Sequence, residues 1–281
     1  IYGQVTGYGE NGPDANKPGF DATAYWARSG LMDLVRTAEA DPAFPAAAMG
    51  DHPSAMTMYA GIVTALLHRE RTGQGTKVSS SLMATGLWAN SAAISGVLSG
   101  APAQQRISRV KPRNALINQY KTSDERWMLV VALPEEKGWP ILAAAIGHEE
   151  LVRDPRFAET PARVGNAEGL RQIIDTAINA KDYAYWHKRF MECGVTFSLV
   201  GTVEEAANDP QALLNDMIIK IEGHNYGSGR AVNSPFWIKG ADKVTPMVGP
   251  ELGANSREVL AGLGYDAAAI ERMIAARVVV V

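Results

Sequence analysis

Asp51 is the residue of this chain whose type and position best suit covalent chemistry. It lies in the stretch Met49-Gly50-Asp51-His52, after small apolar residues and before a long apolar segment predicted to be helical. A carboxylate in such a place is either an ordinary helix N-cap, since aspartate is a preferred cap, or a nucleophile that forms covalent intermediates. The local sequence alone favours the cap, and the two roles are compatible.

Size, charge and hydrophobicity exclude several classes of protein. The chain has 281 residues, 46% hydrophobic and 20% charged, which is enough for more than one domain. The formal net charge of -3 gives no sign of a nucleic-acid or anionic-membrane surface. No apolar run reaches the roughly 18 residues that span a bilayer. We therefore expect a protein that binds neither nucleic acid nor membranes.

Cysteine and histidine content bears on redox and metal chemistry. Cys193 is the only cysteine, which excludes an internal disulfide and fits the reducing cytoplasm. The five histidines are scattered, and no His/Cys cluster has the spacing of metal ligands. We therefore expect a cytoplasmic protein without a metal site.

Helical and alternating patterns follow one another, which is typical of an α/β protein. Apolar residues recur at helical spacing between 54 and 70, and Gly73 follows as a stop signal. Alternation predicts strands at 1–9 and 76–79. The same patterns predict strands within 118–132 and at 195–200, and helices at 22–34, 82–98, 136–145, 169–179 and 183–191. They also predict a helix through 207 that is capped by Thr202, and two short helices between 256 and 276. A strand at the first residue needs neighbours, so we expect the chain to begin inside a larger fold.

Several segments, each weak alone, match one known family in their order along the chain. They are Gly19-Phe20-Asp21, Gly50-Asp51, His68-Arg69-Glu70-Arg71-Thr72-Gly73-Gln74-Gly75, Asp154-Pro155-Arg156-Phe157, Asp209-Pro210-Gln211, Leu252-Gly253 and Leu263-Gly264-Tyr265. Together they resemble the family III (CaiB/BaiF-type) CoA-transferases. Within that family, Gly50-Asp51-His52 and Pro112-Arg113-Asn114-Ala115-Leu116 are most similar to the branch acting on 2-hydroxyacyl, arylacyl and bile-acid CoA thioesters.

The resemblance implies a fold and an assembly. Members have a Rossmann-like large domain and a smaller α/β domain, and two subunits interlock as rings in a homodimer. The implied parts are the C-terminal portion of the large domain at 1–104, a linker at 105–117, the small domain at 118–222, and a return linker with C-terminal helices that pack on the large domain at 223–281. The N-terminal portion of a usual member is then expected to be absent here.

The resemblance also implies covalent chemistry at Asp51. A carboxylate nucleophile attacks an acyl-CoA thioester and gives a mixed anhydride, and the released CoA then forms an aspartyl-CoA thioester that passes CoA to a free acid. Acyl-CoA and carboxylic acids are the implied substrates, and no permanently bound cofactor is expected. A helix that starts at Asp51 would add backbone N–H donors and a positive dipole end.

Five further residues are candidates for supporting roles. Gly50 precedes the nucleophile, and Asp21 aligns with a family acid near the active site, although it is equally a candidate N-cap. His52 can tune the nucleophile or contact substrate, or form only local hydrogen bonds. Arg71 is a candidate for the CoA phosphates or a solvated charge. Asn114 lies where many members carry a glycine-rich loop over the intermediates, and the absence of glycine there leaves the loop role open.

Two other functions compete with CoA transfer. The related 2-methylacyl-CoA racemases carry Gly-His-Asp where this chain has Gly19-Phe20-Asp21, and their histidine exchanges the alpha proton of the substrate. Phe20 carries no such proton, which disfavours racemisation. The expected absence of an N-terminal portion motivates the other alternative, a non-catalytic CoA-binding subunit.

Overall fold

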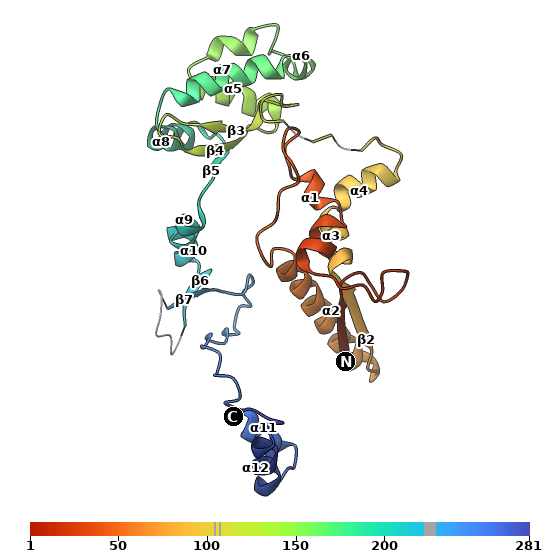
Figure 1. Cartoon of the computed structure of the whole chain (residues 1–281). Coiled ribbons are helices and arrows are strands. Elements are labelled where there is room, and N and C mark those ends of the chain that lie inside the picture. Colours follow the sequence, from red (N-terminus) through yellow and green to blue (C-terminus); the bar gives the residue numbers. More distant parts are fainter. Residues whose placement is uncertain (104, 107, 222–228) are drawn as a thin grey trace. The chain divides into compact units, whose positions relative to one another are not determined.

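The computed structural model describes residues 1–103, 105–106, 108–221 and 229–281 of the chain (Figure 1). Contacts along the backbone divide it into two compact units, Ile1–Val200 and Gly201–Val281. Two of the expected domain boundaries, at residue 104 and at 222–223, fall outside the described residues. The architecture is mixed α/β, as the sequence predicts.

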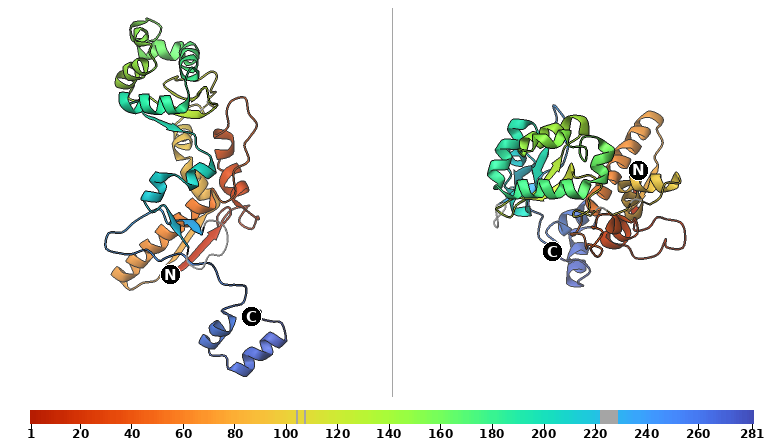
Figure 2. Two further views of the ribbon diagram at one scale, coloured as in Figure 1. Left: turned by 90° about the vertical axis from the view of Figure 1, so that its left-hand side faces the viewer. Right: turned by 90° about the horizontal axis from the view of Figure 1, so that it is seen from above.

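A short parallel sheet carries the longest helix of the first unit. Strands β1 (Tyr2–Thr6) and β2 (Lys77–Ser81) pair in parallel along their whole length. Helix α2 (Asp51–Thr72) belongs to the connection between them and lies along the sheet (Figures 1 and 2). A Cβ atom on Gly61 would lie 2.6 Å from Val78 Cγ1, so a larger residue would push helix and strand apart. The predicted order of strand, helix and strand is confirmed.

Local sequence explains where α2 ends. Gly73 adopts a left-handed backbone with a φ of 72°, which glycine tolerates best, and its N–H donates to Arg69 O at 2.7 Å. Arg69 and Arg71 lie in the last turn, where positive charge complements the helix dipole. The sequence therefore predicts this end correctly, whereas the helix begins earlier than expected, at Asp51.

The helix predicted after the first glycine-rich loop is interrupted. A π-helix, η1 (Asp21–Ala27), and a short helix, α1 (Leu31–Leu34), flank Gly30, whose φ of 83° is left-handed. The N-cap position of η1 belongs to Phe20, so the alternative in which Asp21 caps this helix is wrong. The Asp21 carboxylate instead bonds to a residue distant in sequence.

The helix predicted after β2 is likewise two helices, α3 (Leu82–Ala89) and α4 (Ser91–Leu98). Asn90 lies at the junction, and its Nδ2 donates to Ser29 O at 3.0 Å, which ties this bend to the segment after η1. Helix α3 packs tightly on η1, since a Cβ atom on Gly86 would lie 2.4 Å from a backbone oxygen of η1. These contacts hold η1 and α3 against each other.

The smaller α/β part of the first unit is built on a three-stranded antiparallel sheet. Its strands lie in the order β3 (Ile117–Lys121), β4 (Trp127–Val131) and β5 (Phe197–Leu199). Its helices are α5 (Glu135–Ala145), the 3₁₀ helix η2 (Glu149–Arg153), α6 (Thr160–Gly165), α7 (Ala167–Asn179) and α8 (Tyr183–Cys193). Sheet and helices share one core, which includes Tyr120, Met128, Leu142, Ile174 and Phe190. The strands and helices predicted for this part are confirmed.

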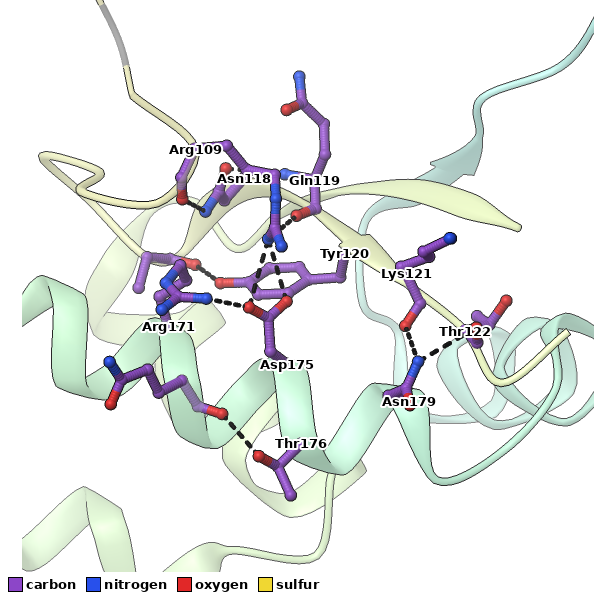
Figure 3. Close-up of polar contacts among 12 residues, drawn as sticks. Arg109, Asn118, Gln119, Tyr120, Lys121, Thr122, Arg171, Asp175, Thr176 and Asn179 are labelled. Atoms are coloured by element: carbon purple, nitrogen blue, oxygen red, sulfur yellow. Dashed lines mark hydrogen bonds and ion pairs between the residues drawn. The ribbon is translucent and has the colours of Figure 1, made fainter. Parts of the chain in front are cut away.

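Arg109 connects the linker before β3 to the three-stranded sheet and to α7 (Figure 3). Its guanidinium pairs with Asp175 at 3.1 Å, donates to Gln119 O at 3.2 Å and lies 5.0 Å from the centre of the Trp127 ring. Asn118 Nδ2 donates to Arg109 O at 3.1 Å. Both the side chain and the backbone of Arg109 are therefore held, which fixes where the linker ends.

The second unit consists of short elements. They are α9 (Val203–Ala207), α10 (Pro210–Leu214), β6 (Ile218–Lys220), β7 (Arg230–Val232), α11 (Ser256–Gly262) and α12 (Ala267–Ala275). Thr202 caps α9 by accepting the Glu205 N–H at 3.2 Å, as predicted, and α11 contacts α12 (Figure 2). None of the helices in the described residues of either unit combines the length and hydrophobicity needed to cross a bilayer.

The ion pair of Glu135 with Arg163 predicts a pH-dependent stability. Burial raises the pKa of Glu135, but hydrogen bonds from Arg163 at 2.7 Å and Thr160 at 3.1 Å outweigh it, so the pKa is lowered. The ionised carboxylate therefore stabilises the fold above its unfolded-state pKa, and this effect is lost as pH falls through the folded-state value. We expect Glu135→Gln to lower the free energy of unfolding by roughly 1–3 kcal/mol near neutral pH.

Urea titrations followed by circular dichroism measure this loss. The difference from the parent should shrink as the pH falls below the ordinary carboxyl range and through the lowered folded-state pKa of Glu135, because the parent carboxylate is then also protonated. Glu136→Gln is the matched control, because Glu136 is the exposed neighbour of Glu135 on the same helix. Equal losses in the two variants at neutral pH, or a loss in Glu135→Gln that persists in acid, would contradict the assigned role.

Candidate active site

Asp51 is the first residue of α2, and it is exposed. The N-cap position belongs to Gly50, so the alternative in which Asp51 is the N-cap of this helix is wrong. The carboxylate lies in the first turn, where the positive end of the helix dipole favours an anion. Asp51 thus combines access to solvent with attachment to a long, regular helix.

The backbone of Gly50 is held at both its N–H and its carbonyl. Asp21 Oδ1, at the start of η1, accepts the Gly50 N–H at 3.0 Å, and Ser54 Oγ donates to Gly50 O at 2.7 Å. A Cβ atom at this position would lie 2.3 Å from Asp21 Oδ1 and 2.3 Å from Tyr25 Cγ, so the packing admits only glycine. The structure therefore joins three predicted residues, Asp21, Gly50 and Asp51, in one arrangement.

Tyr25 packs against Gly50 from η1. Its side chain is buried, and its ring meets the Trp26 ring edge-on with centroids 5.8 Å apart. Burial raises the pKa of the Tyr25 phenol, and the negative charge of Asp21 raises it further. Tyr25 is therefore a neutral packing residue near pH 7, and Asp21 Oδ1 is the hydrogen-bond acceptor of the Gly50 N–H.

Sequence reasoning missed two buried hydroxyls that connect α2 to α3. Ser54 and Thr85 are 3% and 6% exposed, and their side-chain oxygens are 2.6 Å apart. Thr85 Oγ1 also lies 3.1 Å from Ser81 O and 3.0 Å from Leu82 O, in the preceding turn of its own helix. The available signal was a serine one helical turn after Gly50, but serine and threonine are too common here to be singled out.

The start of α2 was expected to offer several backbone N–H donors to a bound anion, but most of them are already used or missing. The N–H groups of Gly50 and His52 donate within the protein, and Pro53 has none. Among the described residues, the Asp51 N–H has no acceptor and is the donor that remains available in this turn.

Two of the predicted supporting residues lie at opposite ends of α2. His52 is exposed next to Asp51. Arg71 lies in the last turn, about 30 Å along the helix axis from Asp51 at the usual rise of roughly 1.5 Å per residue. A small substrate at Asp51 does not reach Arg71, so only an extended ligand could contact both residues.

The Asn114 side chain forms hydrogen bonds within the smaller α/β part of the first unit. Its Nδ2 donates to Glu135 Oε1 at 2.7 Å, and its Oδ1 accepts the Leu116 N–H at 2.8 Å. The adjacent carbonyl of Ala115 accepts the buried Tyr120 hydroxyl at 2.5 Å. These bonds hold the segment that leads into β3 and give Asn114 a structural role, while its predicted supporting role stays a prediction.

The surroundings of Asp21 bear on proton transfer and metal binding. Phe20, the N-cap residue of η1, is 72% exposed and stands next to Asp21. In the described part of the chain, no three His, Cys, Asp or Glu side chains are grouped so as to hold a metal ion. Besides the buried Tyr25, the titratable side chains described at this place are Asp21, Asp51 and His52.

A comparison with protein families places the chain. The model of CoA-transferase family III matches residues 1–256. The chain therefore belongs to CoA-transferase family III, as the ordered motifs predict.

Two curated relatives extend this comparison. The chain is 32% identical over 268 residues to (R)-2-hydroxy-4-methylpentanoate CoA-transferase of Clostridioides difficile, covering 95% of this chain and 66% of the relative. It is 31% identical over 282 residues to cinnamoyl-CoA:phenyllactate CoA-transferase of Clostridium sporogenes, covering 97% and 67%. The chain thus spans about two thirds of the length of these relatives.

Solved structures share the fold. A CaiB/BaiF family protein from Brucella suis matches with a TM-score of 0.80 at 24% identity, covering 94% of this chain and 68% of that one. Rv3272 from Mycobacterium tuberculosis matches with a TM-score of 0.75 at 24% identity, covering 88% and 66%. At these identities the likeness concerns the fold alone, and it confirms the predicted family fold.

The packing around Gly50 predicts a cost for any side chain there. We expect Gly50→Ala to lower the free energy of unfolding by roughly 1–3 kcal/mol, because the new methyl group overlaps Tyr25 and Asp21. Gly75→Ala is the control, since a Cβ atom on Gly75 meets nothing within 4 Å. Chemical denaturation of both variants tests this, and equal stabilities would show that the close approach at Gly50 is wrong.

Proposed function

We propose that this protein is a CoA-transferase that moves CoA from an acyl-CoA thioester to a free carboxylic acid through Asp51. The observation that supports this most is the exposed carboxylate directly after the clamped Gly50, in a chain of CoA-transferase family III. A carboxylate suits the reaction because the enzyme must itself become an anhydride and then a thioester.

The first half-reaction loads CoA onto the enzyme. An Asp51 carboxylate oxygen attacks the thioester carbonyl carbon, the C–S bond breaks, and CoA leaves as a thiolate. The resulting mixed anhydride joins the acyl group to Asp51. The thiolate then attacks Asp51 Cγ, the anhydride C–O bond breaks, and the donor acid leaves as a carboxylate. The product is an aspartyl-CoA thioester.

The second half-reaction runs the same steps in reverse with a new acid. The acceptor carboxylate attacks Asp51 Cγ and expels the CoA thiolate, which gives a second anhydride. The thiolate attacks the acyl carbon of the acceptor, and the Asp51 carboxylate leaves. Each step exchanges a carboxylate and a thiolate, so the cycle needs no net transfer of protons or electrons.

Several residues are proposed to support these steps. The Asp51 N–H and the positive end of α2 favour the negative charge that develops in each tetrahedral intermediate. Asp21 and Gly50 hold the backbone before the nucleophile. His52 adjoins Asp51 and is proposed to contact substrate, while Arg71 is proposed to meet an extended part of CoA.

The names of the relatives indicate a class of acids. One is named for (R)-2-hydroxy-4-methylpentanoate and another for phenyllactate, and both are 2-hydroxy acids. We propose 2-hydroxy and arylacyl acids as the substrates of this protein too. This choice agrees with the branch to which Gly50-Asp51-His52 is most similar.

Racemisation of an acyl-CoA receives less support. Phe20 has no proton to exchange with a substrate, and it stands where the related racemases carry histidine. The remaining alternative is a non-catalytic CoA-binding subunit, which would not need the Asp51 carboxylate. Loss of CoA transfer on replacement of Asp51 therefore distinguishes a transferase from such a subunit.

We further propose that the protein works as an interlocked homodimer in the cytoplasm. The family resemblance supports the assembly, and so do large apolar side chains left exposed, among them Leu67, Trp88 and Leu98 at 50%, 80% and 82%. The single cysteine supports a reducing compartment.

Replacement of the nucleophile tests the function. We expect Asp51→Ala to lower kcat/KM for CoA transfer by roughly 10⁴-fold or more, because no other group can form the covalent intermediates. Initial rates with an acyl-CoA donor and a free acid measure the loss. Asp41→Ala, which removes an exposed carboxylate in the segment before α2, is the control and should match the parent. Parent rates in Asp51→Ala would exclude the proposed mechanism.

A panel of acceptors tests the substrate class. With one acyl-CoA donor, we expect 2-hydroxy acids such as phenyllactate and 2-hydroxy-4-methylpentanoate to give the highest kcat/KM. Dicarboxylic acids such as succinate serve as the comparison. Faster transfer to dicarboxylic acids than to 2-hydroxy acids would contradict the proposed class without affecting the role of Asp51.

A further inference from the structure

Two buried hydroxyls connect α3 to the backbone that precedes Asp51. Ser54 Oγ donates to Gly50 O at 2.7 Å and lies 2.6 Å from Thr85 Oγ1. Each hydroxyl has one hydrogen, so when Ser54 gives its hydrogen to Gly50 O, Thr85 gives its own to Ser54 rather than to Ser81 O or Leu82 O, which its Oγ1 also approaches. A bond accepted by Ser54 Oγ strengthens the one that it donates, because hydrogen bonds in a chain polarise each other.

Local helix geometry accounts for only part of this arrangement. Further along α2, Thr64 Oγ1 donates to Ala60 O at 2.8 Å, which is the same i to i−4 bond that Ser54 makes. Thr64 is exposed, whereas Ser54 is buried against Thr85. The contact with a second helix distinguishes Ser54 from Thr64. An i to i−4 bond within one helix does not need such a contact.

We propose that Ser54 and Thr85 are positioning residues for the reaction at Asp51. They act through the Gly50 carbonyl, which belongs to the peptide bond that joins Gly50 to Asp51, and thereby set the direction of the carboxylate. The proposal rests on the proposed CoA-transferase function.

The chemistry explains why a fixed direction matters. Asp51 attacks through oxygen when an anhydride forms and is attacked at Cγ when the thioester forms, so one carboxyl group must suit several partners in turn. Small displacements of a reacting group are costly, since roughly 1 Å can lower a rate by about 100-fold. A hydrogen-bond chain that anchors the preceding peptide to α3 limits such displacements.

The test is an isosteric replacement. Thr85→Val exchanges the hydroxyl for a methyl group and removes the donor to Ser54. We expect kcat for CoA transfer to fall roughly 10- to 100-fold, with little change in KM for the acyl-CoA, because Thr85 is buried away from solvent. Thr85→Ser keeps the hydroxyl and should recover most of kcat. The measurements use the full-length protein.

Thr64→Val is the matched control, since it makes the same chemical change on the exposed face of α2 and should keep the parent kcat. Thermal melting of each variant checks that the fold is kept. If Thr85→Val does not fold, Ser54→Ala removes the same chain from the α2 side and should show the same fall in kcat.

Three results would overturn the positioning role. They are a Thr85→Val kcat no lower than that of Thr64→Val, a Thr85→Ser kcat as low as that of Thr85→Val, and a rise in KM with kcat unchanged. Failure of the proposed function itself is separate, because it would appear as undiminished activity in Asp51→Ala. An inactive Asp51→Ala beside a fully active Thr85→Val would reject the positioning role alone.

Discussion

The hydrogen bond from the Gly50 N–H to Asp21 is the contact on which the described site depends. It joins the start of α2 to the start of η1, two segments far apart in sequence, at a distance of 3.0 Å. Such an approach is possible only without a side chain at position 50, because Tyr25 and Asp21 fill the space that a Cβ atom would need. This contact holds the backbone immediately before Asp51.

Glycine permits the same kind of close packing elsewhere in this part of the chain. A Cβ atom on Gly7 would lie 2.9 Å from Gly19 Cα, and one on Gly86 would lie 2.4 Å from Tyr25 O. Glycine thus lets neighbouring segments of this part of the chain approach one another closely. A closely packed support of this kind is what the proposed nucleophile would require for precise positioning.

Much of the fold around the site could be predicted from the sequence, and the features that were not predicted share one physical cause. Apolar periodicity and Gly73 located the body and the end of α2, and Thr202 was correctly predicted as a cap. Single helices were predicted where Gly30 and Asn90 impose breaks, since the hydrogen bonds and packing that stabilise those breaks come from distant segments. The Ser54–Thr85 pair was missed for the same reason, because a contact between two helices leaves no periodic signal.

Transfer of heavy oxygen tests the role of Asp51 most directly. If an acceptor acid labelled with ¹⁸O in its carboxylate attacks Asp51 Cγ and the anhydride is then cleaved at its acyl carbon, one labelled oxygen stays on the enzyme. If Asp51 is the nucleophile, mass spectrometry after turnover finds ¹⁸O in the peptide that contains Asp51, and Asp51→Ala takes up none. Full turnover that leaves this peptide unlabelled, or label at a different carboxylate, would contradict a covalent role of Asp51.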